Sequence, residues 1–135
     1  MALKFSVAVR NARLDAIEVN AGVDAIMKIR TGAAPANCAA ADSGTVLATL
    51  TLPTDWMAAA SSGSKAKSGT WADASADAAG TAAHFRIYQS DGTTVVMQGT
   101  VTETGGGGDM TVDNDNFEAG QTFTVTGFTI TDGNA

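Results

Sequence analysis

The sequence predicts a mainly β protein, an antiparallel β-sandwich of the jelly-roll type with one N-terminal α-helix. Apolar residues recur at three- and four-residue steps over residues 3–21, and then at every second residue from Ala25 onward. Thr- and Val-rich segments follow one another at intervals of about ten residues, with glycine-containing turns between them. A chain of 135 residues has the size of one domain. We therefore expect a single domain, 1–135, with the helix at 3–21 and the sandwich at 24–131.

The predicted helix is apolar on two sides and ends at Gly22. One stripe comprises Phe5, Val9, Ala12, Ala16 and Val19. The second lies nearly opposite and comprises Leu3, Val7, Leu14, Ile17 and Ala21, while the polar wedge holds Lys4, Asn11, Asp15 and Glu18. Because a lone surface helix has one apolar stripe, two stripes indicate two packing partners. One is the protein's own sheet, and the other is either a loop of the same chain or another subunit.

The first two strands are predicted at 25–30, where apolar and polar residues alternate, and at 45–52, which Pro53 ends. Residues 31–43 form an alanine-rich loop between them. We expect Trp56 and Met57 to cap the core from a loop. Residues 58–80 are rich in Ala, Ser and Gly, a composition shared by flexible linkers. A short strand at 68–71 is the more economical prediction because it gives Trp71 a place to be buried.

The clearest hairpin pairs residues 83–89 with 93–102 around Asp91 and Gly92, a dipeptide that favours a tight turn. Within it, Gly99 marks a bulge or a point of close packing. A turn at 105–108, which we interpret as a flexible hairpin tip, leads to a strand at 109–112. The last strand is predicted at 121–131.

Catalytic chemistry is not expected. Hydrolysis by a triad needs a nucleophile, a base and a group that orients the base, and the only histidine, His84, lies within a predicted strand. The acidic residues concentrate at turns, where Asp is favoured for its local backbone hydrogen bonds. We therefore predict no enzyme activity, no catalytic residue and no cofactor.

The segment around Asp109, Asp113 and Asp115 is the best candidate for a cation site, since hard cations prefer carboxylate and amide oxygens. It lacks the glycine and the closing glutamate of an EF-hand loop, so a solvated turn is the competing interpretation. The single cysteine, Cys38, excludes an intramolecular disulfide. We expect it to be a small apolar residue in a loop.

Charge is distributed unevenly. The formal net charge is −6, and every charged side chain from Ile87 onward is acidic. Such a surface repels a phosphate backbone, so we expect no nucleic-acid partner. Without an apolar run of about 20 residues or a secretory leader pattern, the sequence indicates a soluble protein assembled in the cytoplasm, with no membrane partner.

Four segments carry a resemblance to a known family: LKFSVAVRNARLDAIE, IRTGAAPANCAAADSGTVLATLTLP, HFRIYQSDGTTVVMQGTVTETGGGGDMTV and GQTFTVTGFTITDGNA. Together they cover most of the chain, which resembles small virion proteins of tailed bacteriophages and prophages. The resemblance implies a structural protein of the phage particle. Within that class, small β-sandwich or jelly-roll cement proteins bind outside the capsid shell and clamp neighbouring capsomers.

We therefore expect a capsid cement or decoration protein that forms homo-oligomers and binds the major capsid protein or other virion proteins. The alternative is a tail or fibre component that faces a receptor. A carbohydrate-binding or hydrolytic domain would need exposed aromatic residues over a groove. The expected contact residues lie on the second helix stripe and on an arm, residues 58–67; they are Leu3, Val7, Leu14, Ile17, Ser61, Ser62, Lys65 and Lys67. The alternative for the stripe is burial within its own domain.

Overall fold

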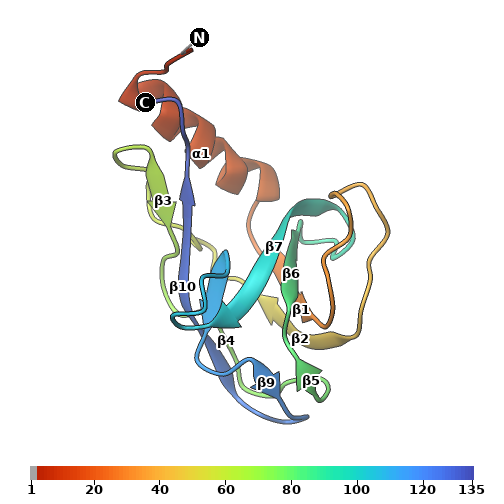
Figure 1. The fold of residues 1–135 in the computed structure, drawn as a ribbon. Helices are drawn as coiled ribbons and strands as arrows, with labels where there is room; N and C mark the ends of the chain where they lie inside the picture. The colour runs from red at the N-terminus through yellow and green to blue at the C-terminus, as the bar shows by residue number, and fades with distance from the viewer. Residues whose placement is uncertain (1–2) are drawn as a thin grey trace.

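The structure is a computed structural model that describes residues 3–135, in which one helix precedes a series of short strands (Figure 1). The helix is α1 (Val7–Ala21). The strands are β1 (Ile26–Arg30), β2 (Val46–Thr51), β3 (Ser64–Ala66), β4 (Ala72–Asp73), β5 (Gly80–Thr81), β6 (His84–Tyr88), β7 (Val95–Glu103), β8 (Met110–Val112), β9 (Asn116–Phe117) and β10 (Phe123–Thr131). With 37% of residues in strands and 11% in the helix, the prediction of a mainly β fold with one N-terminal helix is confirmed.

Helix α1 begins at Val7 rather than at Leu3 because Ser6 caps it. The backbone of Ser6 is extended, and its hydroxyl accepts a hydrogen bond from the main-chain N–H of Val9 at 3.3 Å. The predicted end at Gly22 is confirmed. Gly22 has a positive φ of 76°, and its N–H donates to the carbonyl of Glu18 at 2.9 Å.

The strands form one large sheet in the order β2-β1-β6-β7-β8-β10-β3, with β4 also paired to β10. Strands β5 and β9 make a separate two-stranded sheet. All pairs are antiparallel except β7 and β8, which run parallel with Val101 beside Met110. The sheet is therefore mixed, which differs from the purely antiparallel arrangement that the sequence predicts.

The glycine run at 105–108 explains this parallel pair. It is not a hairpin tip between antiparallel strands, because the chain folds back along β7 before β8 begins. A Cβ on Gly106 would lie 2.7 Å from the Thr102 side chain, and a Cβ on Gly108 would lie 2.9 Å from the same residue. Only glycine fits so close to the strand, so the run is a packed return rather than a loose loop.

The segment after β2 differs from the prediction. The chain is not a strand at 68–71; instead β3 lies within the predicted loop, and β4 begins after Trp71. Trp71 is nevertheless fully buried, and its indole N–H donates to the carbonyl of Trp56 at 3.2 Å and to that of Ser68 at 3.1 Å. Trp71 can be buried outside a strand because these two carbonyls accept hydrogen bonds from its indole N–H.

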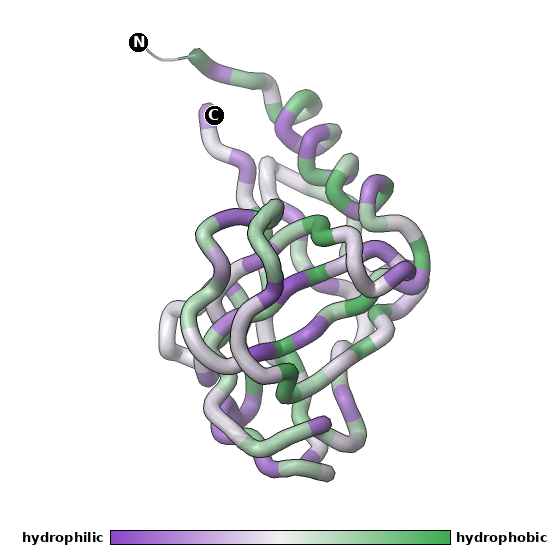
Figure 2. The backbone as a smooth tube through the Cα atoms, turned by 90° about the vertical axis from the view of Figure 1, so that its right-hand side faces the viewer, coloured by the Kyte–Doolittle hydropathy of each residue, from purple (hydrophilic) through white to green (hydrophobic). Residues whose placement is uncertain are grey.

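An aromatic cluster fills the centre of the molecule. The rings of Trp56, Trp71, Phe128 and Phe85 follow one another at centroid distances of 5.8, 5.6 and 5.5 Å. Trp56 and Met57 are buried, which confirms the prediction that they cap the core. In Figure 2 the helix lies along the rim of the strand body, with apolar and polar residues alternating along it. The helix thus covers an edge of the molecule, not the centre of a sheet face.

Candidate interaction surface

The polar side of helix α1 docks on the arm. The side chains that the sequence assigns to the polar wedge point at the arm, residues 58–67, and at the residue before it. Asn11, Asp15 and Glu18 accept hydrogen bonds from the main-chain N–H groups of Gly63, Ala60 and Met57, at 2.9, 3.0 and 3.3 Å. These bonds satisfy backbone donors of an irregular segment that has few ladder partners of its own.

Lys65 fastens the same contact from β3. Its side chain is almost fully buried, and its Nζ lies 2.7 Å from Asp15 Oδ1 and 3.0 Å from Glu18 Oε2. The hydrogen bond from Lys65 is the main cause of the lowered pKa of Asp15. Burial by itself lowers the pKa of Lys65, but its bonds to Asp15 and Glu18 outweigh burial and raise that pKa. The charged pair therefore persists at neutral pH.

The first turns of the helix are tied to the C-terminal end of the chain. Arg10 is buried and donates to the carbonyl of Asp132 at 3.2 Å. Arg13 Nε lies 3.1 Å from the Asp132 carboxylate. Just before the helix, the N–H of Phe5 donates to the carbonyl of Asn134 at 2.7 Å. The segment before α1 and the last residues of the chain consequently lie together at the N-terminal end of α1 (Figure 1).

Since the polar wedge contacts the arm and Leu14 is buried in the core, the other apolar side of the helix faces solvent. We define the outer stripe as Val9, Ala12, Ala16 and Val19, all of which are exposed. Val9 is 43% exposed and Val19 is 81% exposed. Burying a valine side chain contributes about 1.5–3 kcal/mol, a contribution that the isolated chain forgoes at both positions. The outer stripe is an apolar surface that the rest of the described chain leaves uncovered.

The expected contact residues of the helix occupy different environments. Leu3 and Val7 are exposed, at 56% and 48%, because they lie at the N-terminal end of the helix where little of the strand body reaches. Leu14 is 3% exposed and belongs to the core, so it offers no surface to a partner. Ile17 is half-buried. For Leu14, burial within its own domain is the reading that holds, because the second stripe turns toward the strands.

The expected contact residues of the arm divide in the same way. Ser61 and Ser62 are exposed, and Ser62 has a positive φ of 53° at the tip of the turn. Lys67 is half-buried and donates to the carbonyl of Gly69 at 2.9 Å. Lys65 is 2% exposed because it is held by the helix carboxylates. Lys65 is therefore an internal residue and not the surface contact residue that the sequence predicts.

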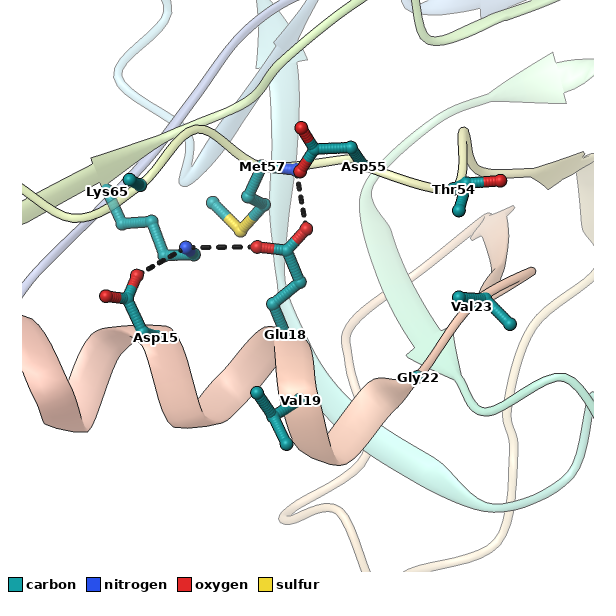
Figure 3. Close-up of a pocket in the computed structure, with 10 residues that line it drawn as sticks. Asp15, Glu18, Val19, Gly22, Val23, Thr54, Asp55, Met57 and Lys65 are labelled. Atoms are coloured by element: carbon teal, nitrogen blue, oxygen red, sulfur yellow. Dashed lines mark hydrogen bonds and ion pairs between the residues drawn. The ribbon is translucent and has the colours of Figure 1, made fainter.

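A cavity of about 530 Å³ opens beside the C-terminal half of the helix (Figure 3). Asp15, Glu18 and Lys65 form one wall, and Thr54 and Asp55 form the opposite rim. The acidic side chains on this wall are already hydrogen-bonded to Lys65 and the main chain. The cavity thus continues the helix surface as a shallow recess.

A second charged cluster, which the sequence analysis missed, holds the loop at 31–45. Arg86 is 1% exposed, and its Nη1 lies 2.7 Å from Asp42 Oδ1. The other oxygen of Asp42 lies 2.8 Å from Arg30 Nη2, and the Tyr88 hydroxyl donates to Oδ1 at 2.8 Å. The sequence carried one signal for this cluster, because Arg86 lies between Phe85 and Ile87 in a predicted strand. In the structure every residue of that strand, β6, is buried.

Further bonds from Arg86 extend this clamp. Its guanidinium donates to the carbonyls of Ala40 and Asn37, each at 3.0 Å, and to Gln98 Oε1 at 2.9 Å. Gln98 in turn donates to the carbonyl of Pro35 at 2.6 Å. The loop, which carries the exposed Cys38, is therefore fixed to β6 and β7 by side chains.

The residues considered for chemistry have local structural contacts. His84 is fully buried, with Nδ1 2.7 Å from the carbonyl of Gly32. Asp109 accepts from the Thr100 N–H at 2.9 Å, and Asp113 accepts from the Thr124 N–H at 3.0 Å. Within residues 3–135, no three His, Cys, Asp or Glu side chains gather at a potential metal site.

No helix in the described part of the chain is long and apolar enough to cross a membrane. Comparisons with protein-family models, with curated proteins and with solved structures found no match for the chain. The surfaces of the molecule therefore carry the functional inference.

Proposed function

We propose that this protein is a structural component of a tailed-phage virion and that it acts as cement on the outside of the major capsid shell. The observation that carries the proposal is the outer stripe of α1. A helix that turns its carboxylates inward and its valines outward forgoes apolar burial in the isolated chain. Contact with a neighbouring subunit recovers that burial.

Adhesion is the mechanism, and it needs no chemical step. A protein that binds the assembled shell but not the dissociated subunits stabilises the shell by its binding free energy, repeated at every copy. The rigid attachment of α1 suits this role. Because Lys65, Arg10 and the arm fix the helix in place, the outer stripe loses little conformational freedom when a partner covers it.

The resemblance to small virion proteins is the reason for proposing a phage particle as the assembly. The segments that carry this resemblance include the helix and the last strand. The major capsid protein is the proposed partner. The acidic character of the chain after Arg86 favours a basic partner surface and disfavours packaged nucleic acid.

Copy number tests the proposal. Particles of the phage or induced prophage that encodes this chain would be purified, and the chain quantified against the major capsid protein by mass spectrometry with isotope-labelled standards. A cement protein is expected at hundreds of copies per particle. A dozen or fewer would assign it to the tail, and its absence from particles would remove the virion role altogether.

A further inference from the structure

Two strand edges face each other across an open slot beside helix α1. Strand β7 pairs with β6 along residues 95–100 and with β8 only along residues 101–103. Strand β10 pairs with β8 as far as Phe128, and its last residues, 129–131, pair only with β3 on the other side. Because β8 starts at Met110, the lane between β7 and β10 has no strand beyond that point. In Figure 1 these two strands diverge above it toward the helix.

Some main-chain N–H and C=O groups along this lane are not used in hydrogen bonds to the neighbouring strands. The N–H of Lys67 donates to the carbonyl of Phe128, and the N–H of Asp132 donates to the carbonyl of Gly63. Hydrogen bonding alternates along an antiparallel pair, so Thr129 and Thr131 direct their N–H and C=O groups away from β3. Because Phe128 is paired with Met110, the N–H of Thr129 faces the carbonyl of Asp109, and Thr131 lies farther along the open lane.

The same alternation applies to β7. The N–H of Val101 donates to the carbonyl of Ala83 on the β6 side, so Thr100 and Gln98 direct their main-chain groups away from β6. Thr100 lies where β8 begins, because the neighbouring Val101 is paired with Met110, and Gln98 lies beyond it. The N–H of Thr100 is met by the Asp109 carboxylate at 2.9 Å. Gln98 has no strand beside it on that edge within the described residues.

The lane is also a cavity. A space of about 340 Å³ is lined by residues of β6, β7 and β10 and by Asp109. A second space of about 340 Å³ continues it under the helix, between Ile17 and the side chains of Val96 and Met97. The rings of Phe85 and Phe128 meet edge to face at 5.5 Å and close the floor. The half-buried Met97 and Ile130 make the walls apolar.

We propose that this slot receives an extended segment of another protein, which adds a short strand between β7 and β10 in line with β8. Unpaired donors and acceptors on both sides are what an extended backbone requires, and apolar walls select its alternate side chains. The slot runs along about three residues of each strand, about 10 Å at 3.3 Å per residue. The inserted strand takes the direction of β8, parallel to β7 and antiparallel to β10.

Charge decides between a second copy of this chain and a different protein. The carboxylate of Asp109 stands at the β8 end of the slot, and no cation pairs with it in residues 3–135. Each copy has a net charge of −6, so two copies repel each other. The occupant is therefore a basic segment, with a Lys or Arg at the end that reaches Asp109. It need not come from a virion protein.

The test uses the folded chain and a blocked hexapeptide, acetyl-Thr-Val-Thr-Ile-Thr-Lys-amide, followed by amide hydrogen exchange in NMR. In the free chain, the amides of Gln98 and Thr131 are expected to exchange faster than those of Met97 and Ile130. At saturating peptide, their exchange is expected to slow at least tenfold. A peptide of the same sequence with N-methyl groups at alternate residues keeps the side chains but loses strand pairing, and we expect it to bind at least tenfold more weakly.

Two variants complete the design. Met97→Glu places a charge in the slot wall and is expected to abolish protection, whereas Val19→Glu, on the outer stripe, is expected to leave it unchanged. A peptide ending in Glu is expected to bind more weakly than the Lys peptide, and Asp109→Asn is expected to remove that difference. No protection at millimolar peptide, or equal binding of the N-methylated peptide, overturns the strand slot. Protection that rises with protein concentration alone would assign the slot to a second copy instead.

Discussion

The Nζ of Lys65 lies 2.7 Å from Oδ1 of Asp15, joining the middle of β3 to the middle of helix α1 across fifty residues of sequence. This bond and the burial of Leu14 hold the same side of the helix against the rest of the molecule. With Asp15 and Glu18 drawn inward to Lys65, the valines of the outer stripe point away from the strands.

Replacing Lys65 tests how much this contact stabilises the fold. Lys65→Met removes the cation and leaves two carboxylates facing each other beside buried surface. We expect the free energy of unfolding to fall by about 1–3 kcal/mol, measured by urea denaturation. Lys67→Met is the matched control, since Lys67 is half-buried and its ammonium bonds only one carbonyl. That control is expected to change stability by less than about 0.5 kcal/mol, and an equal loss in both variants would contradict the assigned role of Lys65.

Asp42 is the single carboxylate between two buried guanidinium groups. Asp42→Ala leaves Arg30 and Arg86 without a counter-charge, so we expect a loss of about 2–4 kcal/mol and faster proteolysis within residues 31–45. Asp77→Ala removes an exposed carboxylate that accepts one bond from Thr49 and serves as the control. If the loop at 31–45 kept its protection in Asp42→Ala, the clamp would be held by the other bonds of Arg86 alone.

Gly99 allows β7 to lie close to an aromatic ring. A Cβ at this position would stand 2.8 Å from the Phe85 ring and 2.9 Å from the Asp109 carboxylate. Gly99→Ala is therefore expected to lower the free energy of unfolding by about 1–3 kcal/mol through overpacking. Gly133→Ala, where a Cβ meets nothing within 4 Å, is expected to be neutral. Thermal unfolding of the two variants provides the comparison.

Stability should also fall in acid. Hydrogen bonds from the Thr94 hydroxyl, and then from the N–H groups of Thr94 and Thr93, lower the pKa of Asp91 to about 2. A carboxylate whose pKa is depressed by folding stabilises the fold above its ordinary pKa of about 3.8, and this stabilisation disappears as pH falls toward 2. The urea midpoint is expected to drop between pH 4 and pH 2, and to drop less in Asp91→Asn. A parallel pH dependence in the two proteins would exclude Asp91 as a contributor.

Local pattern predicted much of this architecture. The alternation over 25–30 gave β1 with Met27 and Ile29 inside, because each strand side chain faces one side only. The turn at Asp91 and Gly92 was also predicted from the sequence. In the structure Asp91 accepts hydrogen bonds from the main-chain N–H groups of Thr93 and Thr94.

The orientation of the helix was not predictable in the same way. Periodicity separates the faces of a helix, but which face turns inward depends on the partner surface. That surface is supplied by Lys65 and by free N–H groups of the arm, in a segment whose small residues are typical of a linker. The parallel pairing of β8 escaped prediction because a six-residue return rarely connects parallel strands. Here the glycines pack against Thr102 and make it possible.

The central claim is that the outer stripe adheres to neighbouring subunits. Its most direct test is the number of copies per purified particle for Val9→Asp combined with Val19→Asp. Ala33→Asp combined with Ala36→Asp, on an exposed loop, adds the same charge elsewhere and is the control. We predict at least a tenfold loss of the stripe variant from particles, with its urea midpoint retained because Val and Asp have similar helix propensities. Incorporation of the folded stripe variant at the level of the unmodified chain would contradict the account.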